Sequence, residues 1–180
     1  MKPYLRNFVR GLIDGILTAF GIVVGASISN SNTVIIITAL SGGIADCFGN
    51  LASAVTAESA DVYTEINELE KKMMIDKKEI KNMMFFKKKI SETYLRSIVD
   101  AISTIVGVII PITPFLFINN INLALQMTIL ISVTSLFILG MLIGKISKEN
   151  MLKLGIKTCF FGVAAAFVCF LLTKFLGASK

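Results

Sequence analysis

The chain has 180 residues, of which 54% are hydrophobic, and its formal net charge is +6. Its long, nearly continuous apolar runs are typical of membrane helices and argue against a soluble domain. The sequence has no His, so a metal or proton site must use carboxylates, amides, hydroxyls or sulfur atoms. In a membrane chain the basic residues first report topology, so no nucleic-acid partner is expected.

Five segments have about the length that crosses a bilayer. They cover residues 8–28, 33–57, 94–118, 123–143 and 158–176. Uncharged Asn-rich turns follow the first and third spans, and a basic link over residues 145–157 precedes the fifth. Asp14 inside the first span favours a retained helix over a signal peptide. The sequence therefore predicts an all-α, polytopic membrane protein embedded in the lipid bilayer.

The segment between the second and third spans, residues 58–93, has a different composition. It contains most of the acids and eight of the lysines but no Pro or Gly, which favours solvated helix. The expected organisation is helices one and two in residues 1–57, a cytoplasmic helical insertion in 58–93, and helices three to five in 94–180.

Lysines and arginines lie on alternate connections: before the first span, in the charged segment, and between the fourth and fifth spans. The two Asn-rich turns carry no charge. The positive-inside rule therefore predicts a cytoplasmic N-terminus, a cytoplasmic 58–93 segment and an outside C-terminus. In a prokaryote this multi-pass protein would lie in the cell membrane.

An internal repeat is predicted from two segments, residues 10–21 and 96–107, which carry Arg, Asp, Thr and Gly at identical spacing. Both segments enter the membrane from the cytoplasm, so the repeat would be parallel and would pair helices one-two with helices three-four. Gly11 and Gly15 in the first copy have the spacing of close helix contacts. Chance similarity between two apolar helices is the alternative.

Three membrane spans contain a carboxylate: Asp14, Asp46 and Asp100. A charge at the bilayer centre costs roughly 2.5–3.5 kcal/mol on insertion scales, so each acid requires a function or a partner. An ion or proton pathway is the functional interpretation. The alternative is a buried ion pair with Arg10 or Arg96, and it is strongest for Asp100.

Polar residues follow one face of each of the first two spans. Asp14 and Thr18 share a face of the first span, and Asp46 and Asn50 share a stripe on the second. If the second span continues as one helix, further acids extend that stripe into the cytoplasm: Glu58, Asp61, Glu65 and Glu68. Such a row would concentrate cations. An ordinary solvated face with Glu/Lys pairs is the alternative.

Two methionine pairs lie in the charged segment, Met73-Met74 and Met83-Met84. Thioethers combined with carboxylates would suit Fe²⁺ or Mn²⁺ better than Ca²⁺ or Mg²⁺. The alternative, which the residues alone favour, is that these side chains cover a hydrophobic contact between two cytoplasmic helices.

Two stretches resemble the vacuolar iron transporter family of ferrous iron and manganese transporters. Residues 11–16, Gly-Leu-Ile-Asp-Gly-Ile, followed by Gly21 and Gly25, are similar to its first-helix D-G motif. Residues 42–53 are similar to its second-helix motif, in which small residues precede G-E-Y-x-S. Five spans, a cytoplasmic N-terminus and an acidic segment between helices two and three match the same plan.

The resemblance implies a homodimer whose ion path follows the subunit interface along helices one and two. It also implies proton-coupled export of Fe²⁺ or Mn²⁺ from the cytoplasm, with no enzymatic activity and no cofactor besides the transported ion. A cytoplasmic metal-binding segment built from acids and Met is implied as well. Its candidate residues here are Glu58, Asp61, Glu65, Glu68, Met83 and Met84.

The match is divergent at the positions that concern metal binding. Asp14 corresponds to the first-helix acid, whereas Asp46 stands where the family often has Met. Asn50 replaces the motif Glu, and Leu51 replaces the Tyr. One carboxylate is kept but moved by one helical turn, which leaves the preferred metal and the proton coupling open. The shorter acidic segment predicts two cytoplasmic helices rather than three.

The sequence thus predicts a divalent-metal exporter in which the acidic segment captures the ion and Asp46, Asn50 and Asp14 pass it on. A first alternative is a non-transporting scaffold that binds a partner through its cytoplasmic helices. A second is an intramembrane aspartyl protease using Asp14 and Asp100 as a proton-sharing pair. The Y-D and G-x-G-D contexts of such proteases are absent from the sequence.

Overall fold

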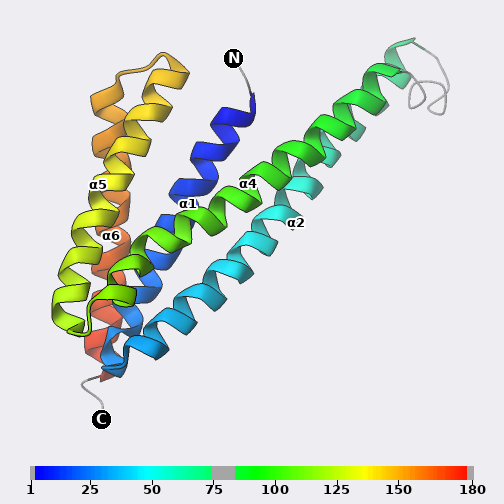
Figure 1. The fold of residues 1–180 in the computed structure, drawn as a ribbon. Helices are drawn as coiled ribbons and strands as arrows, with labels where there is room; N and C mark the ends of the chain where they lie inside the picture. Colours follow the sequence, from blue (N-terminus) through cyan, green and yellow to red (C-terminus); the bar gives the residue numbers. More distant parts are fainter. Residues whose placement is uncertain (1–2, 74–83, 178–180) are drawn as a thin grey trace.

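The computed structural model describes residues 3–73 and 84–177, and within them the chain is helical and has no strand (Figure 1). The helices are α1 Pro3–Ala26, the short 3₁₀ helix η1 Ser27–Ser29, α2 Asn32–Met73, α4 Met84–Phe117, α5 Ile121–Ser147 and α6 Met151–Gly177. This confirms the all-α prediction.

Each of the five long helices contains a stretch long and apolar enough to cross a membrane. The stretches are Tyr4–Ser29, Asn32–Ala57, Tyr94–Phe117, Ile121–Ser147 and Met151–Phe175. Large apolar side chains are exposed along the outer faces of α2, α4 and α6, among them Phe48, Ile102 and Phe160. Such surfaces suit lipid rather than water, and the chain is therefore an integral, multi-pass membrane protein.

The predicted basic link over residues 145–157 is wrong. Helix α5 continues to Ser147 and α6 begins at Met151, which leaves three linking residues. Lysine is a good helix former, and its long stem lets the charge reach the membrane surface from inside the last turns. The break comes instead at Lys148, which adopts a left-handed conformation with φ of 56° and donates its backbone N–H to the Gly144 carbonyl.

Helix α1 is the central element, because it contacts each of the other four long helices. Its Ala19 and Val23 join one buried cluster with residues of α2, α4 and α5, and its Leu12 and Ile16 join a second with α5. Helix α6 lies at the edge of the bundle, with few buried residues. Packing against α4, α5 and α6 therefore fixes the orientation of α1, and with it the face of α1 that meets α2.

The two segments of the predicted repeat pack directly against each other, with α1 and α4 running in the same direction (Figure 1). A Cβ on Gly11 would meet the backbone carbonyl of Asp100, and one on Gly15 would meet that of Thr104. On the other helix, a Cβ on Gly107 would lie 2.5 Å from the Leu12 carbonyl. The glycine spacing thus serves close packing, while the pairing of helices one-two with three-four stays a prediction.

Replacing Gly15 by Ala is expected to destabilise the protein by about 1–3 kcal/mol, because the added methyl collides with the Thr104 backbone. Gly21→Ala is the matched control, since its Cβ would lie 3.4 Å from Cys169 Sγ, an ordinary contact. The measurement is the melting temperature of each purified variant in one detergent. Equal melting temperatures for the two variants would contradict the close α1–α4 contact.

Candidate functional site

Helices α1 and α2 run antiparallel and meet along a line of polar contacts inside their membrane spans. The Asn50 side-chain amide Nδ2 donates to Asp14 Oδ2 at 2.6 Å. The Thr18 hydroxyl donates to Asp46 Oδ2 at 2.8 Å. We call Asp14, Thr18, Asp46 and Asn50 the polar seam. It arises because each helix places its two members four residues apart, and therefore on one face.

Close approach of the two helices at the seam depends on the glycines of α2. Gly42 lies against the Ile22 side chain of α1, one turn beyond the Thr18–Asp46 contact. Gly43 lies against the Val108 side chain of α4, with a would-be Cβ 2.5 Å from its nearest atom. Contacts with α1 and α4 therefore fix the position of α2. They also fix how α2 is aligned along α1, and so which polar side chains meet.

All four seam residues are half-buried within the chain. On another face of α1, by contrast, Ile16 and Ala19 are fully buried. The seam offers two carboxylates, one amide and one hydroxyl. These are oxygen ligands, which suit harder divalent cations, and carboxylates can also accept protons. Within the described residues, no group of three or more His, Cys, Asp or Glu side chains is arranged to hold a metal ion.

Asp100, the third intramembrane acid, has a different environment. Its side chain is almost fully buried, and Oδ2 lies 3.7 Å from Nη2 of Arg10. Its backbone carbonyl accepts the hydroxyls of Ser103 and Thr104 at 2.8 and 3.0 Å. This is the ion-pair environment expected of an acid that stabilises the α1–α4 contact, so the structural interpretation of Asp100 is supported.

The row of acids that follows the second span lies on one continuous helix with the seam, because α2 extends unbroken from the membrane span to Met73. Asp61 and Glu68 are exposed and Glu65 is half-buried. Glu65 and Glu68 each have an interaction partner in the structure. Glu58 belongs to α2, but its side chain lies outside the described residues.

The methionine candidates lie where the structure gives no side-chain contacts. Met83 falls outside the described residues, and Met84 begins α4 with its side chain likewise outside them. The start of α4 runs alongside the part of α2 that extends beyond the membrane span (Figure 1). A methionine contribution to metal binding therefore stays a prediction.

Thr18 is the one seam member that was not predicted as a site residue. Its position four residues after Asp14 was a usable signal, because the two side chains share a face of α1. That it would bond Asp46 depends on how far α2 is shifted along α1. This shift is set by packing between the helices and has no signature in either helix alone.

A sequence model of the VIT family matches residues 51–174, more than half of the chain. The matched region includes the part of α2 beyond the membrane span and helices α4 to α6, and it begins one residue after Asn50. The chain is also similar to an uncharacterized protein of Methanocaldococcus jannaschii. The two are 44% identical over 169 residues, which cover 94% of this chain and 88% of the relative.

The family match agrees with the five membrane helices and with the resemblance noted in the first two spans. Because the matched region begins after Asn50, it gives no information on Asp14, Asp46 and Asn50. On this evidence the chain belongs to the VIT family, a family of membrane transporters of metal ions.

Proposed function

We propose that the protein exports a divalent transition metal, Fe²⁺ or Mn²⁺, from the cytoplasm in exchange for protons. The observation that carries the proposal is the polar seam, in which two intramembrane carboxylates from adjacent helices lie in contact with an amide and a hydroxyl. Carboxylates inside a membrane are costly and mark ion pathways. A carboxylate that releases a metal ion can take up a proton, which gives a chemical basis for exchange.

The entrance of the pathway is proposed to lie along the cytoplasmic part of α2. From Asp61 to Asp46 the helix spans about 22 Å at 1.5 Å per residue. The exposed carboxylates of Asp61 and Glu68 lie on this extension. They would raise the local concentration of divalent cations by electrostatic focusing, and the ion would then pass to the seam.

The direction of transport rests on the proposed orientation. The N-terminal end, the turn between α5 and α6 and the extension of α2 and α4 lie toward one end of the bundle, and the C-terminal end lies at the other (Figure 1). The first of these ends carries most of the lysines and arginines. The positive-inside rule assigns it to the cytoplasm and the C-terminus to the outside, across the cell membrane if the organism is prokaryotic.

A homodimer is proposed because the seam is half-buried rather than enclosed. Two carboxylates provide too few ligands for a divalent ion, which takes about six oxygen ligands when bound by hard donors. A second copy facing the same surface of α1 and α2 would add its own pair of carboxylates. Waters and the seam amide and hydroxyl would complete the coordination.

The proposal is tested by Mn²⁺ flux into proteoliposomes, with empty liposomes as background. Thr18→Val is expected to lower flux at least about threefold, because Asp46 loses a hydrogen bond to a charged group. Thr38→Val is the matched control, since this exposed threonine of α2 bonds only the carbonyl of Val34 in its own helix among the described residues. Absence of Mn²⁺ and Fe²⁺ flux in the wild type, with intact folded protein, would overturn the proposal.

A further inference from the structure

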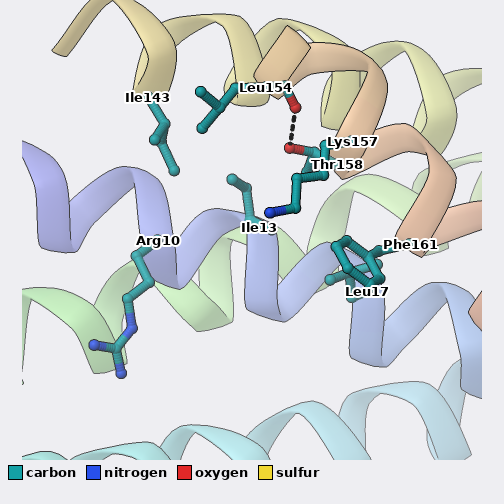
Figure 2. A pocket seen from close by; sticks show the side chains of 8 residues that line it. All are labelled: Arg10, Ile13, Leu17, Ile143, Leu154, Lys157, Thr158 and Phe161. Atoms are coloured by element: carbon teal, nitrogen blue, oxygen red, sulfur yellow. Dashed lines mark hydrogen bonds between the residues drawn. The ribbon is translucent and has the colours of Figure 1, made fainter. Parts of the chain in front are cut away.

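A cavity of about 340 Å³ opens between α1, α5 and α6, on a different face of α1 from the seam (Figure 2). Its wall is mainly apolar and is built by Ile13, Leu17, Ile143, Leu154 and Phe161. A volume of this size is comparable to that of small-molecule pockets. Phe161 on its wall is more than half exposed, so the cavity is open to the outside of the bundle, where lipid chains can reach it.

A second cavity adjoins the first, because Leu154 lines both. It measures about 480 Å³ and lies at the turn between α5 and α6, where its wall is mainly polar. Lys148 and Lys153 line it, with Asn150 and one carboxylate, Glu149. A basic, polar cavity therefore continues into an apolar one.

Lys157 lines the apolar cavity, whereas Lys153 lines the polar one. It lies one helical turn after Lys153 on the same face of α6, and its amine points toward the space beside Ile13 (Figure 2). Among the residues that the structure describes, no carboxylate lies within ion-pair distance of Lys157. Arg10 also lines the apolar cavity, and its Nη2 forms an ion pair with Asp100.

The lysines lie near the turn between α5 and α6, from where a long lysine side chain can reach the head-group region of a bilayer. Lys157 lies about 9 Å along α6 from its first residue, at 1.5 Å per residue. The turn itself, with Lys148, lies at the end of the bundle that bears most of the basic residues. Basic pockets between membrane helices on the cytoplasmic side bind the head groups of anionic lipids.

We propose that the two cavities form one binding site for an anionic phospholipid of the surrounding leaflet. Lys148 and Lys153 hold the head group, Lys157 pairs with the phosphate, and one acyl chain fills the apolar cavity between α1 and α6. The occupant is amphipathic because the cavities are: a free anion would leave the apolar cavity empty. A zwitterionic lipid would offer its phosphate but would also bring the positive charge of its choline among three lysines.

The experiment compares melting temperatures of the purified full chain with added phosphatidylglycerol or phosphatidylcholine of the same acyl chains. Phosphatidylglycerol is expected to raise the melting temperature by about 3 °C more than phosphatidylcholine, because it binds the folded state selectively. In the double variant Lys153→Gln/Lys157→Gln this difference should fall by more than half. Lys174→Gln, at the far end of the same helix, should keep it in full.

Two further arms identify the occupant. Inorganic phosphate alone should give no stabilisation, whereas stabilisation equal to that of phosphatidylglycerol would mean a free-anion site and would overturn the proposal. Equal effects of the two lipids would mean that the shared phosphate and acyl chains are sufficient and that net negative charge is not recognised, which also overturns it. Native mass spectrometry gives an independent readout: the wild type should retain phosphatidylglycerol, and the double variant should retain at least about tenfold less, equivalent to 1.4 kcal/mol.

Discussion

Asp46→Asn and Asp14→Asn are each expected to reduce Mn²⁺ flux in proteoliposomes by at least about tenfold. Asn has nearly the shape of Asp and can still accept the hydrogen bond from Thr18 or from Asn50. Each substitution therefore removes a negative charge and little else. Two unit charges 4 Å apart interact with about 4 kcal/mol at an effective dielectric constant of 20, and 1.4 kcal/mol already equals a factor of ten in binding.

Asp100→Asn is the control for these two variants. Asp100 occupies the same position in its repeat segment as Asp14, but it is paired with Arg10. Its substitution should lower the melting temperature while leaving Mn²⁺ flux per folded molecule unchanged. Wild-type flux in Asp46→Asn and Asp14→Asn would refute the seam as the ion path. Loss of flux in Asp100→Asn at unchanged stability would mean that Asp100 belongs to the ion path.

The same three variants bear on the protease alternative, which needs Asp14 and Asp100 to share a proton. In the structure Asp14 accepts a hydrogen bond from Asn50 of α2, while Asp100 pairs with Arg10 of α1. The two acids are thus stabilised by different partners. Peptide cleavage by the wild type that is lost in both Asp14→Asn and Asp100→Asn would be needed to favour that chemistry.

The membrane helices could be predicted from the sequence because hydrophobicity over about 20 residues sets the span length directly. The end of α5 and the start of α6 could not be predicted, because lysines continue a helix as readily as they link two helices. A helix boundary depends on a local backbone change, here the left-handed Lys148, for which an averaged hydropathy gives no signal.

The candidate site could be predicted in part. The four-residue spacing of Asp14 with Thr18, and of Asp46 with Asn50, follows from the helical period and is confirmed by the seam contacts. Which residue of α1 bonds which residue of α2 could not be predicted, because the relative shift of the helices is fixed by contacts such as Gly42 with Ile22. The Arg10–Asp100 pair was one of two ion pairs that the sequence left open, and the choice of Arg10 over Arg96 depends on the same packing.

The acids of the α2 extension could be placed on one helix from the sequence, but their partners could not be assigned. Glu65 and Glu68 both have interaction partners in the folded chain. Glu68 is followed by Lys71 and Lys72 at the spacing of helical ion pairs, whereas Glu65 has no lysine within four residues. Charge spacing along α2 therefore does not decide how free such a row of acids is.

Asn50→Asp is expected to lower the stability of the metal-free protein and to raise its apparent affinity for Mn²⁺ by at least about tenfold. The Asn50 amide donates to Asp14 at 2.6 Å, and an ionised carboxylate cannot donate. Two carboxylates would then face each other, with Asp46 one turn away, and their repulsion is relieved when a divalent cation binds between them. The number of charged ligands is also what tunes the affinity of oxygen-ligand sites.

The measurement is the melting temperature of Asn50→Asp across a Mn²⁺ titration, from which the apparent affinity follows by linkage. Ser53→Asp is the matched control, because it adds the same charge to α2 three residues further on, at an exposed position. If the two variants gain Mn²⁺ affinity equally, the effect is one of general negative charge and the seam is not the ligand set. A gain confined to Asn50→Asp would assign the ion to the contact between Asp14 and residue 50, since only there does the new carboxylate meet an existing one.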